Sequence, residues 1–218
     1  MSDVIVFMSL TLDGVMQAPG RPDEDRRGDF EHGGWATPYA DAATGRLAAE
    51  GMADTGVLVL GRRTYQDILA HWNGAGGPFK EMLNGTPKYV ASRTLREPLP
   101  WPRSTLLEGD AVDAVADLRR QPGKGLVILG SGDLVRSLMR RDLIDRYVLL
   151  IHPIVLGEGQ RLFDDGAPTT ALRLVDSRTT STGITMATYS PVDRAHRHGS
   201  EPWVPSPIVG VGPPLRSR

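Results

Sequence analysis

The feature that most constrains the fold is a repeated alternation of short apolar runs with helical stretches. The runs are rich in β-branched residues and too short for buried helices, so we interpret them as buried strands. They lie at 4–8, 57–60, 87–91, 106–107, 126–129 and 146–154. Strands that alternate with helices form crossover units and pair in parallel. The sequence therefore predicts an α/β fold around a mostly parallel sheet.

The end of the chain and the helices complete the expected order of elements. The runs at 172–175 and 184–189 follow one another without a helical stretch, so we expect antiparallel strands there. For the first helix, Thr37 is the expected N-cap and Pro38 the first helical residue. Helices are predicted over 37–52, 111–120 and 133–140.

Composition excludes several classes of protein. The 218 residues suffice for one domain with a sizeable core, and the net charge of -1 argues against a broad nucleic-acid surface. The absence of Cys excludes disulfides and cysteine metal sites, and His196 and His198 lack further ligands, so we expect no metal. No basic leader precedes the first strand, and no apolar run reaches the ~20 residues of a membrane helix. We therefore expect a soluble, cytoplasmic protein that binds a small molecule and neither nucleic acid nor membrane.

Three predicted strands end in small, polar or basic residues just before a helix or loop. The carboxyl ends of parallel strands lie along one edge of the sheet, where open α/β sheets bind ligands. Glycine lets a phosphate approach the backbone, and a helix N-terminus offers it free N–H groups. The pattern predicts a nucleotide site at this edge. The three ends are Gly61-Arg62-Arg63-Thr64, Ser92-Arg93-Thr94 and Gly130-Ser131-Gly132-Asp133-Leu134.

Basic residues at two of these ends indicate which dinucleotide binds. Guanidinium groups bind phosphate dianions with paired hydrogen bonds, so Arg62, Arg63 and Arg93 favour a cofactor with an additional 2′-phosphate. We therefore predict NADPH rather than NADH. A Rossmann fold is not expected, because the segment 130–132 lies late in the chain and lacks the third glycine of that fingerprint.

Together these motifs resemble the dihydrofolate reductase superfamily. The resemblance is closest to the branch that contains the reductase half of the bacterial bifunctional riboflavin deaminase-reductase, and it covers roughly residues 4–189. It implies a three-layer fold, NADPH as cofactor and hydride transfer to the substrate. It rests on the ordered set Asp13-Gly14, Gly61-Arg62-Arg63-Thr64-Tyr65, Ser92-Arg93-Thr94, Gly130-Ser131-Gly132, Leu156-Gly157-Glu158-Gly159 and Leu162-Phe163.

The resemblance also implies roles for the residues at the sheet edge. The segment 61–64 would hold the adenine-side phosphates, with Ser92 and Arg93 near the 2′-phosphate. The segment 130–134 would wrap the pyrophosphate and nicotinamide side, with a cis peptide bond between Gly130 and Ser131. Ser9 and Met16 would approach the nicotinamide ring.

Four residues are candidates for catalysis and substrate binding. Dihydrofolate reductases hold their pterin with an acidic residue on the first helix, and Asp41 is the candidate here, although its spacing differs from the family pattern. The alternative for Asp41 is dipole stabilisation of a first helical turn. Asp13 is a candidate proton relay, with an Asp-Gly turn as the alternative. His32 and Trp35 are candidates for lining the pocket of a flat heterocycle, and core packing is the alternative for Trp35.

These patterns lead us to expect an NADPH-dependent reductase of a small heterocyclic (pteridine- or pyrimidine-like) or carbonyl substrate. One alternative is a stand-alone reductase of riboflavin biosynthesis that acts on 5-amino-6-(5-phosphoribosylamino)uracil. Another is a non-catalytic NADPH-binding sensor or interaction module. We expect the reductase domain over residues 1–192 and a proline-rich arm over 193–218. Because the reductase branch commonly forms dimers, we expect a homodimer with the arm packed at its interface.

Overall fold

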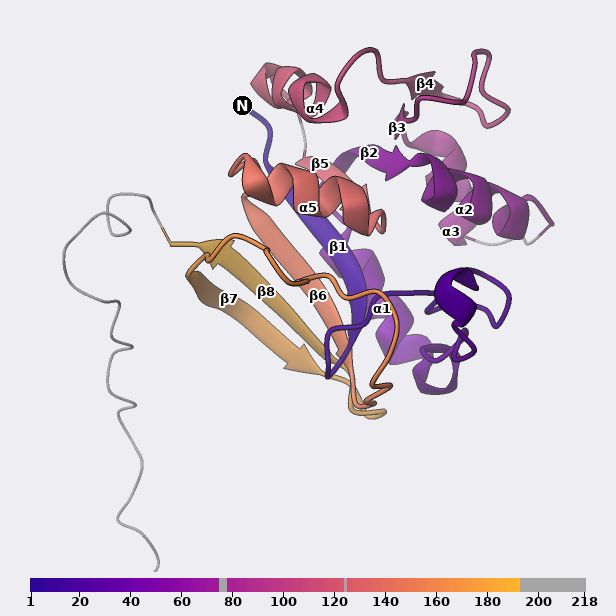
Figure 1. The fold of residues 1–218 in the computed structure, drawn as a ribbon, viewed down its shortest axis with the longest axis vertical. Helices are drawn as coiled ribbons and strands as arrows, with labels where there is room; N and C mark the ends of the chain where they lie inside the picture. Colours follow the sequence, from indigo (N-terminus) through magenta and orange to yellow (C-terminus); the bar gives the residue numbers. More distant parts are fainter. Residues whose placement is uncertain (75–77, 124, 193–218) are drawn as a thin grey trace, which may run out of the picture.

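The computed structural model describes residues 1–74, 78–123 and 125–192. Its centre is an eight-stranded sheet in the order β4-β3-β2-β5-β1-β6-β8-β7 (Figure 1). The strands are β1 Val4–Thr11, β2 Thr55–Gly61, β3 Lys88–Ala91, β4 Ser104–Leu106, β5 Gly125–Leu129, β6 Arg146–His152, β7 Leu172–Thr179 and β8 Thr185–Pro191. The helices are α1 Ala42–Gly51, α2 Arg62–Gly74, α3 Pro78–Gly85, α4 Ala111–Arg120 and α5 Gly132–Arg140, with 3-10 turns at Arg27–Asp29 and Thr37–Tyr39.

The direction of the strands follows the connections between them. Every neighbouring pair from β4 to β6 is parallel, whereas β8 pairs antiparallel with both β6 and β7. Parallel neighbours need a long crossover, while β7 and β8 follow each other directly and are joined by a short turn. The predicted mostly parallel sheet with antiparallel C-terminal strands is confirmed.

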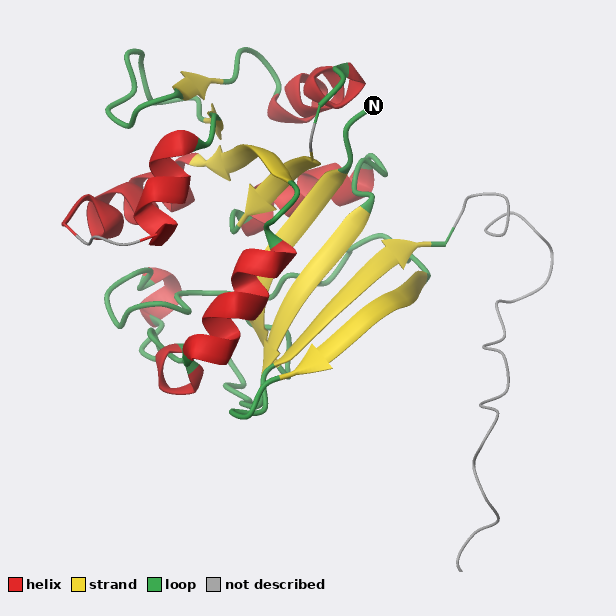
Figure 2. Ribbon diagram, turned by 180° about the vertical axis from the view of Figure 1, so that it is seen from behind, coloured by secondary structure: helices red, strands yellow, loops and turns green. Residues whose placement is uncertain are grey.

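Alternation of side chains along the strands gives the sheet two apolar faces. On β1, Val4, Val6 and Met8 belong to one buried cluster, and Ile5 and Phe7 belong to the other. Helices α4 and α5 cover the first face, and α1, α2 and α3 cover the second (Figures 1 and 2). The predicted three-layer α/β fold is therefore confirmed.

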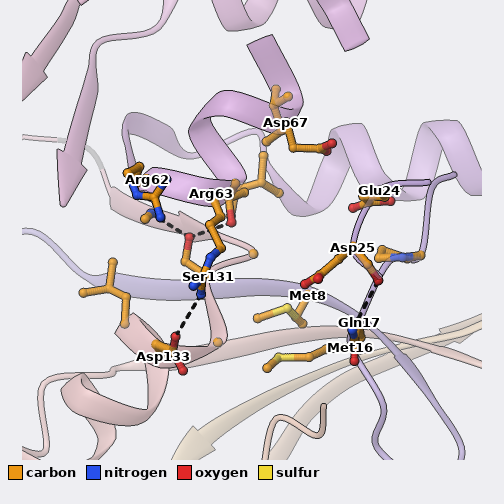
Figure 3. Close-up of a pocket in the computed structure, with 18 of the residues that line it drawn as sticks. Met8, Met16, Gln17, Glu24, Asp25, Arg62, Arg63, Asp67, Ser131 and Asp133 are labelled. Atoms are coloured by element: carbon orange, nitrogen blue, oxygen red, sulfur yellow. Dashed lines mark hydrogen bonds and ion pairs between the residues drawn. The ribbon is translucent and has the colours of Figure 1, made fainter. Parts of the chain in front are cut away.

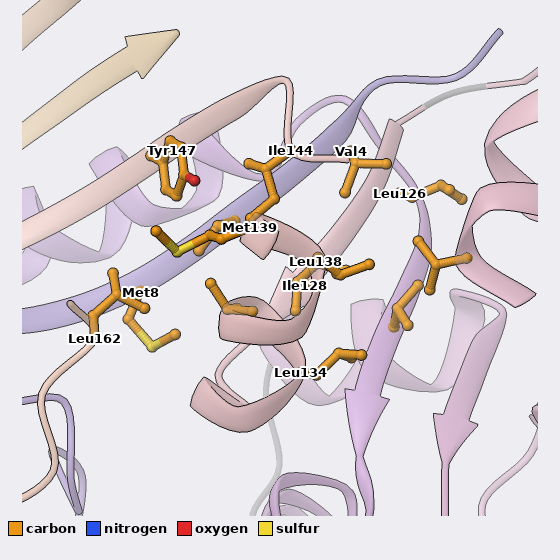
Figure 4. Close-up of a cluster of buried hydrophobic side chains, with 14 of the residues drawn as sticks. Val4, Met8, Leu126, Ile128, Leu134, Leu138, Met139, Ile144, Tyr147 and Leu162 are labelled. Atoms are coloured by element: carbon orange, nitrogen blue, oxygen red, sulfur yellow. The ribbon is translucent and has the colours of Figure 1, made fainter. Parts of the chain in front are cut away.

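Helix α5 is the helix whose packing does most to position the site. Its buried side chains Leu134, Leu138 and Met139 lie against β1 and β5, where they meet Met8 and Ile128 (Figure 4). Burial of each such side chain contributes roughly 1.5–3 kcal/mol. This packing holds the first turn of α5 at the carboxyl end of β5.

The first helix begins later than the sequence predicts. The segment Thr37–Tyr39 forms a 3-10 turn, Ala40 is extended, and α1 starts at Ala42 with Asp41 as its N-cap. Thr37 does not cap a helix, because its hydroxyl donates to the carbonyl of Gly20 at 3.0 Å. Helix α3 has no counterpart among the predicted helices, since it has only eight residues and its apolar pattern is correspondingly short.

Two further expectations concern the C-terminal arm and membrane-spanning helices. The arm at 193–218, including His196 and His198, lies outside the described residues, so its packing at a dimer interface stays a prediction. Within the described part of the chain, no helix combines the length and the apolar character that crossing a membrane requires.

Candidate active site

A large cavity lies along the carboxyl ends of the parallel strands. Its volume is 1510 Å³, more than the roughly 300–1,000 Å³ of an ordinary small-molecule site, which leaves room for a dinucleotide and a second molecule. The structure brings together here all the residues that the sequence proposes for the cofactor. They are Ser9, Met16, Gly61, Arg62, Arg63, Thr64, Ser92, Arg93, Gly130, Ser131, Gly132, Asp133 and Leu134.

The turn between β5 and α5 has an unusual backbone. Gly130 and Ser131 both have φ values of 65°, in the left-handed region. The peptide bond between them is trans, so the cis bond implied by the resemblance is absent, and the two positive φ values make the turn instead. The hydroxyl of Ser131 accepts a hydrogen bond from the backbone N–H of Gly61 at 2.6 Å and donates one to Thr64 Oγ1 at 2.9 Å. Ser131 thus ties the ends of β5 and β2 together.

This use of the Ser131 hydroxyl leaves the N-terminus of α5 open. Ser131 occupies the N-cap position of α5, but no side chain caps the helix. By contrast, Asp110 caps α4 by accepting hydrogen bonds from the N–H groups of Val112 at 2.9 Å and Asp113 at 3.2 Å. Both helices begin at the cavity. Of these two, only α5 presents uncapped N–H groups, which suit an anion.

Glycines allow the close packing around this open helix end. A Cβ at Gly130 would lie 3.0 Å from Cγ2 of Thr64, and a Cβ at Gly61 would lie 3.0 Å from Oγ of Ser131. A Cβ at Gly132 would collide with the side chain of Met16, which lies over the turn. A larger residue at position 61 or 130 would therefore disturb the Ser131–Thr64 hydroxyl pair, whereas one at position 132 would displace the flexible end of the Met16 side chain.

Three arginines give this end of the cavity a positive charge. Gly61 pairs with Ala91 in the parallel register, which brings the residues that follow each strand, Arg62 and Ser92, side by side. Arg62 donates to the Gln66 amide at 3.1 Å, and Arg63 lies 3.9 Å from the Asp133 carboxylate. Arg62 and Arg93 form no ion pair among the described residues.

The other end of the cavity carries three carboxylates, those of Glu24, Asp25 and Asp67 (Figure 3), and two of them are paired with arginines. Asp67 of α2 forms an ion pair with Arg21, and Asp25 forms one with Arg27. The Gln17 amide accepts from the N–H of Gln160 at 3.0 Å and donates to two backbone carbonyls of its own loop. No sequence pattern predicts these residues, because the pairs join segments that are distant in sequence or lie within one loop.

Glu24 is a carboxyl of the cavity whose pKa lies above its ordinary value. Burial raises its pKa, although its carboxylate accepts hydrogen bonds from the N–H groups of Gly20 at 2.7 Å and Arg21 at 3.1 Å, which lower it. Asp25 differs, since its hydrogen bonds with the Arg27 side chain lower its pKa. Glu24 is therefore a candidate proton donor that sequence reasoning missed.

Asp13 does not line the cavity, which corrects its assignment as a catalytic residue. Its carboxylate accepts hydrogen bonds from the Thr11 hydroxyl at 2.6 Å and from the N–H of Gly157 at 2.9 Å, and it pairs with Arg161 at 3.3 Å. The hydrogen bond from Thr11 is the largest cause that lowers the pKa of Asp13 to about 2. A carboxylate that stays ionised cannot relay a proton near neutral pH. Asp13 instead joins the loop after β1 to the loop after β6.

We expect Asp13→Asn to lower the free energy of unfolding by about 1–2 kcal/mol at neutral pH, after discounting for partial exposure. A carboxyl whose pKa falls on folding contributes stability that is complete above its unfolded pKa of 3.8 and is lost as the pH falls toward 2. Urea denaturation of wild type and variant at neutral pH and near pH 2 measures this. The difference should shrink in acid; a difference independent of pH would contradict an ionic role.

Asp41 is a helix cap and also lies outside the cavity lining. Its carboxylate accepts hydrogen bonds from the N–H of Thr44 at 2.7 Å, the Thr44 hydroxyl at 2.8 Å and the Ser181 hydroxyl at 3.0 Å. The first of these is the largest cause that lowers the pKa of Asp41. The assignment of Asp41 to pterin binding is therefore corrected to the capping alternative.

The two residues predicted to bind substrate do not line the cavity. His32 is exposed and lies 3.3 Å from the Glu158 carboxylate. Trp35 is buried, and its indole N–H donates to the carbonyl of Gln17 at 2.7 Å. Trp35 instead supports His152, whose ring it meets edge to face. His152 does line the cavity, and its position at the end of a predicted parallel strand was the signal that could have revealed it.

The family profile of the RibD C-terminal domain matches residues 2–186, which is most of the chain. The chain belongs to the RibD C-terminal domain family. This membership confirms the resemblance to the reductase branch of the dihydrofolate reductase superfamily, and it identifies a reductase-like domain.

Solved structures share this fold. A protein from Shewanella sp. PV-4 assigned to riboflavin biosynthesis superposes with a TM-score of 0.67 at 26% identity, over 88% of this chain and 100% of its own. A pyrimidine reductase-like protein from Corynebacterium diphtheriae superposes with a TM-score of 0.59 at 13% identity, over 88% of this chain and 92% of its own. The second likeness shows the fold alone.

Two similar proteins of Bacillus subtilis (strain 168) are uncharacterized. YyaP is 32% identical over 109 residues, which are 50% of this chain and 57% of YyaP. YwjB is 34% identical over 70 residues, which are 32% of this chain and 40% of YwjB. The chain thus spans about half the length of these relatives.

Proposed function

We propose that this member of the RibD C-terminal domain family is an NADPH-dependent reductase that transfers hydride to a small heterocyclic or carbonyl substrate. The observation that carries the proposal is the uncapped N-terminus of α5, which shares one cavity with Arg62, Arg63 and Arg93. Free N–H groups and the helix dipole favour a phosphate there. A second phosphate beside the arginines matches the extra group of NADPH.

In this proposal, one end of the cavity binds the cofactor and the other end binds the substrate. NADPH supplies the hydride when it is bound. The turn 130–132 and α5 would bind its pyrophosphate, and Arg62 and Arg93 would bind its 2′-phosphate. The segment 17–44 and helix α2 enclose the other end, where the substrate would meet the cofactor and where Glu24, whose pKa is raised by burial, is the candidate proton donor. Asp133 lies beside Arg63 and Arg136, which offset its charge near the pyrophosphate.

The substrate class follows from the family and from the wall of the cavity. Ile68, Trp72 and Phe79 line it from α2 and α3, and such a wall suits the face of a pteridine- or pyrimidine-like ring. The narrower alternative is 5-amino-6-(5-phosphoribosylamino)uracil, which the family and the assignment of the Shewanella protein favour. A sensor that binds NADPH without turning it over is the remaining alternative.

Oxidation of NADPH by the purified protein tests the proposal. We expect the NADPH absorbance to fall in the presence of 7,8-dihydropterin or 5-amino-6-(5-phosphoribosylamino)uracil, and to stay constant without them. Binding of NADPH with no turnover of either compound or of simple aldehydes favours the sensor. A protein that does not bind NADPH at all refutes the proposal.

A further inference from the structure

His152 ends β6 at the wall of the cavity, and none of the roles above uses its side chain. It is 3% exposed, yet it lines the cavity and pairs with Thr11 of β1 in the parallel register. Its ring meets Trp35 and Tyr39 edge to face, with centroids 5.1 Å and 5.8 Å away and interplanar angles of 87° and 74°. These contacts hold the imidazole plane in one orientation.

The hydrogen bonds of the ring determine which of its nitrogens can meet a ligand. Nδ1 lies 3.1 Å from the carbonyl oxygen of Leu150 and 3.3 Å from that of Leu10. Both partners only accept, so Nδ1 carries the hydrogen and Nε2 keeps its lone pair. Burial lowers the pKa of His152, and the ring is therefore neutral at neutral pH. Nε2 has no hydrogen-bond partner in the part of the chain that the structure describes.

Most polar side chains of the segment 17–44 that line the cavity have hydrogen-bond or ion-pair partners within the protein. Besides the amide and carboxylates described above, the Thr37 hydroxyl donates to the carbonyl of Gly20 and the Thr44 hydroxyl donates to Asp41. Arg26 is the exception among the described lining residues of this loop, and its exposed guanidinium can only donate. His152 Nε2 is therefore a hydrogen-bond acceptor whose position is fixed by the ring contacts and which has no donor among the described residues.

Another part of the lining of the same cavity is apolar and aromatic. Trp72 at the end of α2 and Phe79 of α3 lie with ring centroids 4.9 Å apart, and Ile68 lies one turn before Trp72. Such a surface binds the face of a flat ring without requiring charge. A ligand that contacts this aromatic surface and also bonds to His152 Nε2 must have an apolar face and a hydrogen-bond donor on its edge.

We propose that His152 positions the substrate by accepting a hydrogen bond at Nε2 from a ring N–H or amino group of a flat, uncharged heterocycle. This inference rests on the proposed function, since it concerns the substrate end of the same cavity. It makes His152 a specificity-determining residue, because a carbonyl compound without an N–H or O–H donor leaves Nε2 unpaired. Trp35 and Tyr39 are positioning residues that act through the imidazole.

Binding and kinetics of His152 variants test the inference, with 7,8-dihydropterin and 5,6-diaminouracil as probes. We expect His152→Phe, which keeps the ring but loses both nitrogens, to weaken binding of the preferred probe about 10–100-fold. The affinity for NADPH should stay unchanged, which also shows that the variant is folded. His152→Gln, whose amide oxygen can replace Nε2 as acceptor, should recover part of the loss. His32→Phe is the matched control, because His32 is exposed and does not line the cavity.

Two separate titrations keep the proposals distinguishable. Failure of the wild type to bind NADPH counts against the proposed function, whereas the probe titration decides the inference. Equal probe affinity in the wild type and His152→Phe overturns it, as does a wild type that binds NADPH but neither probe. A loss in His152→Phe that appears only in kcat, with KM and probe affinity unchanged, also overturns the positioning role.

Discussion

NADPH should bind this protein at least about 100-fold more tightly than NADH. The two cofactors differ by the 2′-phosphate, and Arg62 and Arg93 line the cavity without an ion-pair partner among the described residues. A charge-assisted hydrogen bond contributes roughly 1.5–3 kcal/mol. Two such contacts therefore give about 3 kcal/mol at the lower limit, and each 1.4 kcal/mol is about tenfold in affinity. Calorimetric titration of both cofactors at one ionic strength measures the ratio.

A pair of arginine variants assigns this preference to a residue. Arg93→Ala should weaken NADPH binding about 10–100-fold and leave NADH binding unchanged. Arg96→Ala is the matched control, because Arg96 lies in the same loop, donates to the carbonyl of Leu95 at 3.0 Å and does not line the cavity. Equal affinities for the two cofactors, or a preference for NADH, would refute the phosphate assignment.

Gly130→Val should abolish cofactor binding, with a loss of at least about 100-fold, while the protein still folds. A branched side chain disfavours the φ of 65°, and its Cβ would lie 3.0 Å from Cγ2 of Thr64. Thr64 and Ser131 would have to separate, and the uncapped N–H groups of α5 would turn away from the phosphate. Losing two hydrogen bonds from these N–H groups to the phosphate, at roughly 1.5 kcal/mol each, weakens NADPH binding about 100-fold. NADPH titration measures the loss, and circular dichroism verifies the fold.

The control for this variant must carry the same backbone strain elsewhere. Gly166→Val is suitable, because Gly166 has a φ of 87°, has open space around its Cβ position and does not line the cavity. Both variants should lose about 1–2 kcal/mol of stability from the left-handed backbone. Only Gly130→Val should lose NADPH. Similar loss of affinity in both would point to general destabilisation, and undiminished affinity in Gly130→Val would exclude the turn from the site.

The cofactor end of the cavity could be foreseen because it follows from local pattern. An apolar run predicts a parallel strand, and the residues after it must lie at one edge of the sheet. Gly61, Ser92 and Gly130 therefore share one edge of the sheet, and the strand order β3-β2-β5 makes them neighbours there. The shape of the turn after β5 was not foreseeable, because its two positive φ values accompany a contact of the Ser131 hydroxyl with β2, which lies about 70 residues earlier in the sequence.

The substrate end of the cavity could not be predicted, because loop residues form much of it. Asp13 was chosen beside an expected turn and Asp41 as the acidic residue of the first helix. In the structure, the Asp13 carboxylate joins two loops and the Asp41 carboxylate caps α1. The segment 17–44 is held by ion pairs such as that of Arg21 with Asp67, and no spacing in the sequence predicts such pairs. His152 was predictable in principle, since the same strand-end argument that selected Gly61 and Gly130 applies to β6.

The bond from Gly61 to the hydroxyl of Ser131 has a further consequence for how a ligand enters. Ordering the backbone of one residue costs roughly 1–2 kcal/mol of conformational entropy. The turn after β5 is ordered within the protein by its contacts with Gly61 and Thr64. A phosphate that arrives at α5 meets a preorganised receptor, so more of its interaction energy remains as affinity and association needs no prior rearrangement of this turn.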